Sequence, residues 1–148
     1  MSAFRFRLAS VLRYRERKRE DKRLELRDIE LAKEKINSEI ERLEANLDRL
    51  CLDMEQEEAK PIALTELRLA ADFSQALAAR IRECRRLLLD IERRAAAKRV
   101  ELLDANRDVK SLEQLRERRR ERHRLEESRA EQKLTDEAGQ RGAVGKRH

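Results

Sequence analysis

The feature that most restricts the fold of this chain is a seven-residue repeat of apolar side chains. Two such rows, offset by three residues, run through residues 26–54. The first row contains Leu26, Ile40, Leu47 and Met54, with Lys33 as its exception. The second row contains Ile29, Ile36, Leu43 and Leu50. Apolar residues at the a and d positions of a heptad are typical of helices that pack in coiled coils.

A second pair of rows begins after Pro61, the only proline in the chain. One row contains Leu67, Ile81, Leu88, Ala95, Leu102 and Val109, with Ser74 as its exception. The other contains Leu77, Cys84, Ile91, Ala105 and Leu112, with Lys98 as its exception. Because proline interrupts helices, Pro61 marks a turn between the two repeats. The apolar rows stop after Leu112, but residues 113–133 keep good helix formers and should remain helical without a full partner.

These repeats predict an all-α fold, namely a long antiparallel two-helix coiled-coil hairpin in which the second helix is longer. The predicted boundaries are a first helix over about 5–58, a turn over about 59–65 and a second helix over about 66–135. Together they form a single domain over 1–138, and the glycine-containing residues 139–148 are expected to be a disordered tail. An unbroken parallel dimer is the competing arrangement, which Pro61 disfavours.

Composition agrees with a thin core. Charged residues make up 46% of the chain and aromatic residues only 3%, whereas average domains carry about 25% charge. Three glycines and one proline are too few for the turns of a sheet protein. No apolar run is long enough to span a bilayer, and no apolar secretory signal is expected at the N-terminus. Cys51 and Cys84 are expected to be ordinary helix residues in a reducing compartment.

Charge is distributed unevenly along the chain, although its formal net value is +6. Residues 1–23 carry a net +6 and residues 24–66 a net −7, followed by +4 in 67–112 and +3 in 113–148. In an antiparallel hairpin the first and last segments lie together, so the end that holds both termini is expected to be basic. A basic end favours an acidic partner through electrostatic steering.

Nucleic acid is the other acidic partner to consider. Arg13, Arg15 and Arg17 precede a leucine repeat, which is superficially similar to a bZIP protein. Glu16, Glu20 and other acidic residues interrupt this run, and no asparagine lies in it to contact adenine. A basic coiled-coil nucleic-acid-binding protein therefore remains an alternative, with nucleic acid disfavoured as a partner.

No catalytic or metal-binding constellation is recognisable in the sequence. His123 and His148 are the only histidines and belong to no cluster of ligands. The glycines of residues 139–146 lack the strand, the helix and the Ser or Thr of a phosphate-binding loop. We therefore expect no enzymatic activity, no metal, no cofactor and no small-molecule substrate.

Several apolar side chains lie outside the a and d rows. In the first repeat these are Leu24, Leu31 and Leu52, and in the second they are Leu69, Phe73, Leu87, Leu89, Leu103 and Leu115. Single exposed leucines are ordinary in proteins. Phe73, the only internal phenylalanine, is more informative, because it either anchors an interface or closes the core near the turn.

Three stretches of the chain resemble a known family. They are Phe4-x-Phe6-x-Leu8-x-x-Val11-Leu12-x-x-Arg15, Leu77-x-x-x-Ile81, and Val109-Lys-x-Leu112-Glu-x-Leu115-x-Glu117-Arg118 followed by His123, Glu126 and Glu131-Gln132-Lys133. With the chain length, these stretches are similar to the FliJ family of bacterial flagellar export proteins over about residues 1–138. Stalk proteins of virulence type III secretion systems share this architecture and are an alternative.

The resemblance implies a non-catalytic coiled coil similar to the central stalk of rotary ATPases. Its partners would be a hexameric export ATPase, the cytoplasmic part of the export gate membrane protein, and export chaperones. It would act in the cytoplasm, peripherally associated with the inner membrane at the flagellar base, in flagellum biogenesis and motility.

The resemblance also implies positions for the contacts. Residues at the basic end would bind the ATPase ring, and these are Arg5, Arg7, Arg13, Arg116, Arg119, Arg120 and Arg124. Residues in the middle of the chain would bind the export gate, and these are Leu43, Leu50, Phe73 and Leu77.

Overall fold

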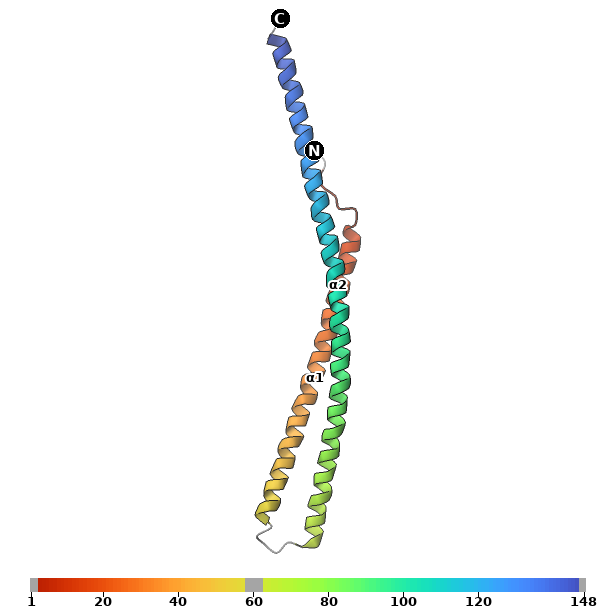
Figure 1. Cartoon of the computed structure of the whole chain (residues 1–148), viewed down its shortest axis with the longest axis vertical. Coiled ribbons are helices and arrows are strands. Elements are labelled where there is room, and N and C mark those ends of the chain that lie inside the picture. The colour runs from red at the N-terminus through yellow and green to blue at the C-terminus, as the bar shows by residue number, and fades with distance from the viewer. Residues whose placement is uncertain (1–2, 58–62, 147–148) are drawn as a thin grey trace. The chain divides into compact units, whose positions relative to one another are not determined.

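The computed structural model describes residues 3–57 and 63–146, and these residues contain two α-helices and no strand (Figure 1). Helix α1 spans Ala9–Glu57 and helix α2 spans Leu64–Lys146. The two helices pack against each other. The prediction of an all-α helical hairpin with a longer second helix is therefore confirmed.

The contacts divide the chain into two compact units, each made of a part of α1 and a part of α2. The terminal unit comprises Met1–Glu20 with Leu103–His148, and the hairpin unit comprises Asp21–Leu102. The single domain expected over residues 1–138 stays a prediction.

The hairpin unit is held by the predicted a and d rows. Its buried core consists of Ile40, Leu43, Leu77, Ile81 and Cys84. Half-buried residues of the same rows pack against this core, and these are Ile36, Leu47, Leu50 and Leu88. Every one of these residues occupies an a or d position, so the apolar repeat identified the core correctly.

Ion pairs between the two helices show their direction in the hairpin unit. Glu30 of α1 pairs with Arg99 of α2, and further along α1 Glu44 pairs with Arg85, at 2.7 Å. Because the α2 partner moves toward lower numbers as α1 advances, the helices are antiparallel. These pairs also define the register, which the repeats alone left open.

Lysines at core positions form ion pairs at the edge of the apolar seam. They include Lys98 and also Lys22, which lies one heptad before Ile29 in the second row of the first repeat. Lys22 Nζ lies 3.0 Å from a Glu101 carboxylate oxygen and 3.6 Å from one of Glu25. Lys98 Nζ lies 2.6 Å from Glu25 and 3.0 Å from Glu101, which completes a four-residue ion-pair cluster across the helices. Lysine can occupy a core position here because its methylene stem lies along the apolar seam while its ammonium group stays at the edge.

Hydrogen bonds within this cluster shift its protonation equilibria. Those from Lys98 to Glu25, and from Lys22 and Lys98 to Glu101, lower the pKa of both carboxyl groups below the ordinary value of 4.5. The hydrogen bonds of Lys98 with Glu25 and Glu101 raise the pKa of Lys98. All these shifts favour the charged forms, so the cluster is a set of ions at neutral pH.

The terminal unit has a smaller core of the same kind. Leu12 of α1 is 3% exposed, Ala105 of α2 is 7% exposed and Val109 is fully buried. Arg15 pairs with Asp108 at 3.2 Å beside this core. The a and d rows therefore continue to organise the contacts toward the start of α1, although arginines occupy several of their positions.

The helix ends differ in part from the predicted boundaries. The first helix begins at Ala9 rather than near residue 5, and the Ala9 amide donates to the Phe6 carbonyl at 3.1 Å. Most of the predicted turn over 59–65, including Pro61, lies outside the described residues. The second helix begins at Leu64, where the preceding Ala63 carbonyl accepts from the Glu66 amide at 3.0 Å.

The C-terminal region also differs from the prediction. The second helix continues to Lys146, so residues 139–146, expected as a disordered tail, are helical in the structure. Extending an existing helix requires no new nucleation, and isolated glycines weaken a helix by only about 1 kcal/mol each. Neither described helix contains a segment long and apolar enough to cross a membrane.

Shortening a buried side chain in the hairpin core should destabilise the protein. Because Leu43 is 4% exposed, Leu43→Ala should lower the free energy of unfolding by about 2–4 kcal/mol, measured by urea denaturation. Leu89, which is 54% exposed, provides the matched control, and Leu89→Ala should change it by less than about 0.5 kcal/mol. Equal effects of the two substitutions would contradict the assigned core.

The ion-pair cluster predicts a loss of stability in acid. Glu25 and Glu101 have lower pKa values in the folded chain than in the unfolded chain. They therefore contribute to the free energy of unfolding above about pH 4.5, and this contribution is lost as the pH falls through their folded pKa values. The Tm should therefore drop between about pH 6 and about pH 3. This drop should be smaller in the double variant Glu25→Gln, Glu101→Gln. A control that removes two exposed carboxylates, Glu55→Gln with Asp90→Asn, should retain the full drop.

Candidate partner-binding surfaces

The segment before α1 alternates aromatic and basic side chains. Phe4 and Phe6 are half-buried, whereas Arg5 and Arg7 are exposed. Successive residues of an extended chain point to opposite sides, which explains the alternation. The two phenylalanines therefore attach this segment to the protein, and the two arginines face solvent.

The attachment site of this segment is on α2. The ring centroids of Phe4 and His123 lie 5.7 Å apart at a tilted angle of 55°. The Arg119 guanidinium lies 5.9 Å from the centre of the Phe6 ring. Tilted aromatic pairs and cation–π contacts are both attractive, so residues 4–6 and the 119–123 stretch form one surface of the terminal unit.

The predicted ATPase-binding arginines of α2 are all on the surface. Arg116, Arg119, Arg120 and Arg124 are exposed. Arg124 is held by Glu121 at 2.6 Å, and this hydrogen bond lowers the pKa of the Glu121 carboxyl. Arg119 is oriented by the Phe6 ring. Among the described residues, no ion pair engages Arg116 or Arg120, so these two guanidinium groups are available to an acidic partner.

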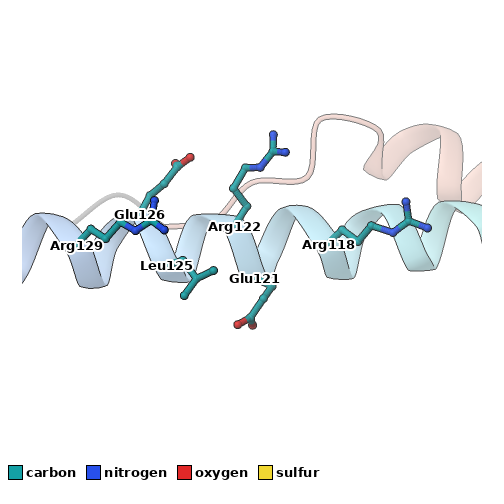
Figure 2. Close-up of a pocket in the computed structure, with 6 residues that line it drawn as sticks. All are labelled: Arg118, Glu121, Arg122, Leu125, Glu126 and Arg129. Atoms are coloured by element: carbon teal, nitrogen blue, oxygen red, sulfur yellow. The ribbon is translucent and has the colours of Figure 1, made fainter.

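The neighbouring stretch of α2 forms a shallow open pocket (Figure 2). It is lined by Arg118, Glu121, Arg122, Leu125, Glu126 and Arg129. Arg122 and Glu126 project to one side of the helix, and Glu121 and Leu125 project to the other. Leu125 is 44% exposed. Such a surface suits an extended macromolecular contact better than an enclosed small molecule.

Arg13 belongs to the α1 part of the terminal unit. It is exposed and lines a second shallow pocket with Glu16, Arg17, Arg19 and Glu20. All seven arginines predicted to bind the ATPase ring therefore lie in the terminal unit.

The two units differ in net charge. The terminal unit contains twenty Lys and Arg residues against twelve Asp and Glu residues, a net +8. The hairpin unit contains seventeen against nineteen, a net −2. The net positive charge of the chain thus lies in the terminal unit, which makes this unit the candidate for binding an acidic surface.

The residues predicted to bind the export gate fall into two groups. Leu43 and Leu77 are only 4% and 8% exposed, because they occupy d positions between the two helices. Their side chains therefore do not face a partner while the hairpin unit is formed. Phe73 is 54% exposed, and Leu50 is half-buried beside it.

Phe73 contributes to an apolar surface pocket of the hairpin unit. The pocket is lined by Leu50, Glu66, Leu69, Ala70 and Phe73. Leu69 is 72% exposed. An exposed Phe73 does not close the core near the turn, and its role as an interface anchor stays a prediction.

Sites for metals or covalent chemistry do not emerge in the described part of the chain. No group of three or more His, Cys, Asp or Glu side chains there could hold a metal ion. Cys51 is exposed and Cys84 is buried in the hairpin core, and both are free thiols.

The contact of Phe4 and Phe6 with α2 was missed by the sequence analysis. Its signal was the alternation of phenylalanine and arginine over residues 4–7, which is an extended rather than a helical pattern. Treating these residues as the first turn of a helix concealed it.

Removing the two rings should release the N-terminal segment. In Phe4→Ala, Phe6→Ala the hydrogen exchange of the Ala9 amide, which donates to the Phe6 carbonyl, should accelerate by about tenfold, because the segment loses both contacts with α2. Tyr14→Ala is the matched control. Tyr14 is 52% exposed, and among the described residues its ring contacts are with Arg15 and Lys18 of its own helix, so this change should leave the Ala9 amide protected. Unchanged exchange in the double variant would contradict the attachment.

Comparison with known proteins places the chain in a family. Residues 4–148 match the family described as the flagellar FliJ protein. No curated protein and no solved structure matches the chain. Since the family match covers essentially the whole chain, this protein belongs to the FliJ family and is a component of the bacterial flagellar export apparatus.

Proposed function

We propose that this chain is a non-catalytic stalk that couples the hexameric export ATPase to the export gate. Its terminal unit binds the ATPase ring and favours assembly of the ring, which stimulates ATP hydrolysis. Membership of the FliJ family supports this role. The protein would act in the cytoplasm at the inner membrane beneath the flagellum.

The observation that carries the ATPase contact is the charge of the terminal unit. This unit has a net +8 and exposes Arg116 and Arg120 without an ion pair among the described residues. Guanidinium groups bind carboxylates in a planar, two-bond geometry, so exposed arginines are suited to an acidic ring lumen.

The gate contact is proposed for the apolar pocket of the hairpin unit. Phe73, Leu69 and Leu50 form its apolar lining, and an exposed aromatic side chain beside aliphatic ones is typical of an interface anchor. Leu43 and Leu77 would support this surface from the core rather than contact the gate. Export chaperones are further proposed partners, for which no surface is assigned.

Mixing the chain with its cognate ATPase tests the proposal. At low salt the wild-type chain should raise ATP turnover and increase the oligomer size of the ATPase. Arg116→Glu, Arg120→Glu should require about tenfold more protein for the same stimulation, since two favourable charge contacts become repulsive.

A matched double reversal provides the control. Arg82 and Arg86 are exposed on the α2 part of the hairpin unit, so Arg82→Glu, Arg86→Glu changes the net charge equally and should leave stimulation intact. Phe73→Ala should weaken binding to the gate without affecting ATP turnover. No change in turnover or oligomer size with the wild-type chain would overturn the ATPase contact. Retention on DNA with a steep salt dependence would instead favour the nucleic-acid alternative.

A further inference from the structure

The outer face of α1 in the hairpin unit carries a third apolar row. With Leu26 and Ile29 at a and d, the f positions are occupied by Leu24, Leu31, Ser38, Ala45 and Leu52. These positions lie opposite the a and d rows, and all five residues are exposed. The three leucines are 48%, 45% and 58% exposed. One such leucine would be ordinary, but a row at seven-residue intervals forms a continuous stripe.

The corresponding row of α2 is different. In the hairpin unit its f positions hold Asp72, Ala79, Arg86, Arg93 and Val100. Three of these five residues are charged, as expected for a helix face that contacts only water. The apolar f row is therefore a property of α1 and not a general feature of the two helices.

Charged residues flank the f row of α1 in a regular pattern. The b positions on one side hold Arg27, Glu34, Glu41 and Asp48, and the c positions on the other side hold Asp28, Lys35, Arg42 and Arg49. In each of these four heptads the b and c residues have opposite signs. All eight side chains are exposed.

These flanking charges are largely unused within the chain. Among the described residues only Arg42 of the eight forms an ion pair, with Glu39 on its own helix at 2.6 Å. Charges on the opposite side of α1, such as Glu25, Glu30 and Glu44, pair with α2 instead. The outer charges therefore remain available to a second molecule.

The signs of the charges at the b and c positions indicate which molecule can bind the outer face of α1. When two identical helices pack in parallel and in register through their f rows, the b residues of each face the c residues of the other. Glu34, Glu41 and Asp48 would then face Lys35, Arg42 and Arg49 of the second copy. Arg27 would face Asp28 in the same way. Every flanking pair in this arrangement is attractive.

Antiparallel packing fits less well. It brings b residues against b residues, so with Ser38 at the centre Glu34 would face Glu41 and Lys35 would face Arg42, and both contacts are repulsive. Only the outer residues, Arg27 with Asp48 and Asp28 with Arg49, would attract. We infer that the outer face of α1 binds a second copy of this chain, in parallel and in register, with Ser38 and Ala45 allowing the two helices to approach closely. This inference does not depend on the proposed export function.

The dimer contact is expected to have a low affinity. Only one apolar row is buried, whereas a stable coiled coil buries two, and association must offset the lost freedom of both partners. The charge pairs therefore determine partner and orientation, and the dimer should dissociate as salt screens them.

Sedimentation velocity of the full chain tests the inference. Over about 5 to 500 μM at low salt, the wild-type chain should shift from monomer toward dimer, and salt near 1 M, where the Debye length is about 3 Å, should reverse the shift. Leu31→Glu should abolish the dimer. Leu89→Glu is the matched control, because Leu89 is similarly exposed on α2. The chain with Leu89→Glu should dimerise like the wild type. A monomer at every concentration would overturn the inference and leave the stripe to a different partner.

Charge reversal provides a second test, in which two variants that cannot self-associate should restore the contact when they are mixed. A chain with Lys35→Glu, Arg42→Glu and Arg49→Glu has acidic flanks on both sides of the stripe. A chain with Glu34→Lys, Glu41→Lys and Asp48→Lys has basic ones. Neither variant should self-associate, but an equimolar mixture should form a heterodimer. A mixture that stays monomeric, with both variants helical by circular dichroism, would contradict the charge pairing.

Spin labels on Cys51 determine the orientation. Cys51 is exposed at an e position, next in sequence to Leu52 of the stripe, while Cys84 is buried and therefore protected from labelling. In the parallel dimer the two labels should lie within about 25 Å, whereas antiparallel packing about Ser38 separates them by about 39 Å at 1.5 Å per residue. Pulsed electron resonance distinguishes the two distances, and the longer one would refute the parallel arrangement.

Discussion

Burial of the a and d side chains between two antiparallel helices is the contact on which the other features of this protein depend. Among the described residues only nine hydrophobic side chains are buried, and every one occupies an a or d position. A core this narrow places most side chains at its edge, where water or an opposite charge satisfies them. This is how a chain with 46% charged residues folds at all.

The exceptions in the apolar rows show how the register is specified. Leucines along a seam allow helices to slide by a heptad with little change in burial, whereas a charged residue at a core position must meet its partner. Lys22 and Lys98 meet Glu101 and Glu25 in only one alignment of the hairpin unit. Lys33, the remaining lysine in these rows, lies 4.0 Å from Glu92. These lysines bury less apolar surface than leucines would, but they specify one register of the two helices.

Heptad counting could predict the helices and the core, because both depend on a period that the sequence displays directly. It could not predict the register, which depends on pairs such as Glu44 and Arg85 that lie far apart in sequence. The family resemblance places Leu43 and Leu77 at a partner surface, although the d positions that the repeat gives them are buried. Heptad counting also predicts helix over residues 5–8, because the contact of Phe4 with His123 is tertiary and leaves no local periodicity. Helix continuation to Lys146 was missed because glycine was given too much weight as a terminator.

A two-helix coiled coil buries its a and d positions and pairs charges at e and g across the helices, so the b, c and f positions remain for contacts with other molecules. Whether such a position serves another contact depends first on whether it has a partner within the fold. The b and c charges of α1 include Glu34, Lys35 and Asp48, which pair with nothing among the described residues, although the chain contains many opposite charges. Arg116 and Arg120 of the terminal unit are in the same situation. An unpaired charge is stable in water, so its presence requires no partner, but a regular alternation of unpaired signs beside an apolar row is not needed for solubility. Recognition explains that regularity, and solvation alone does not.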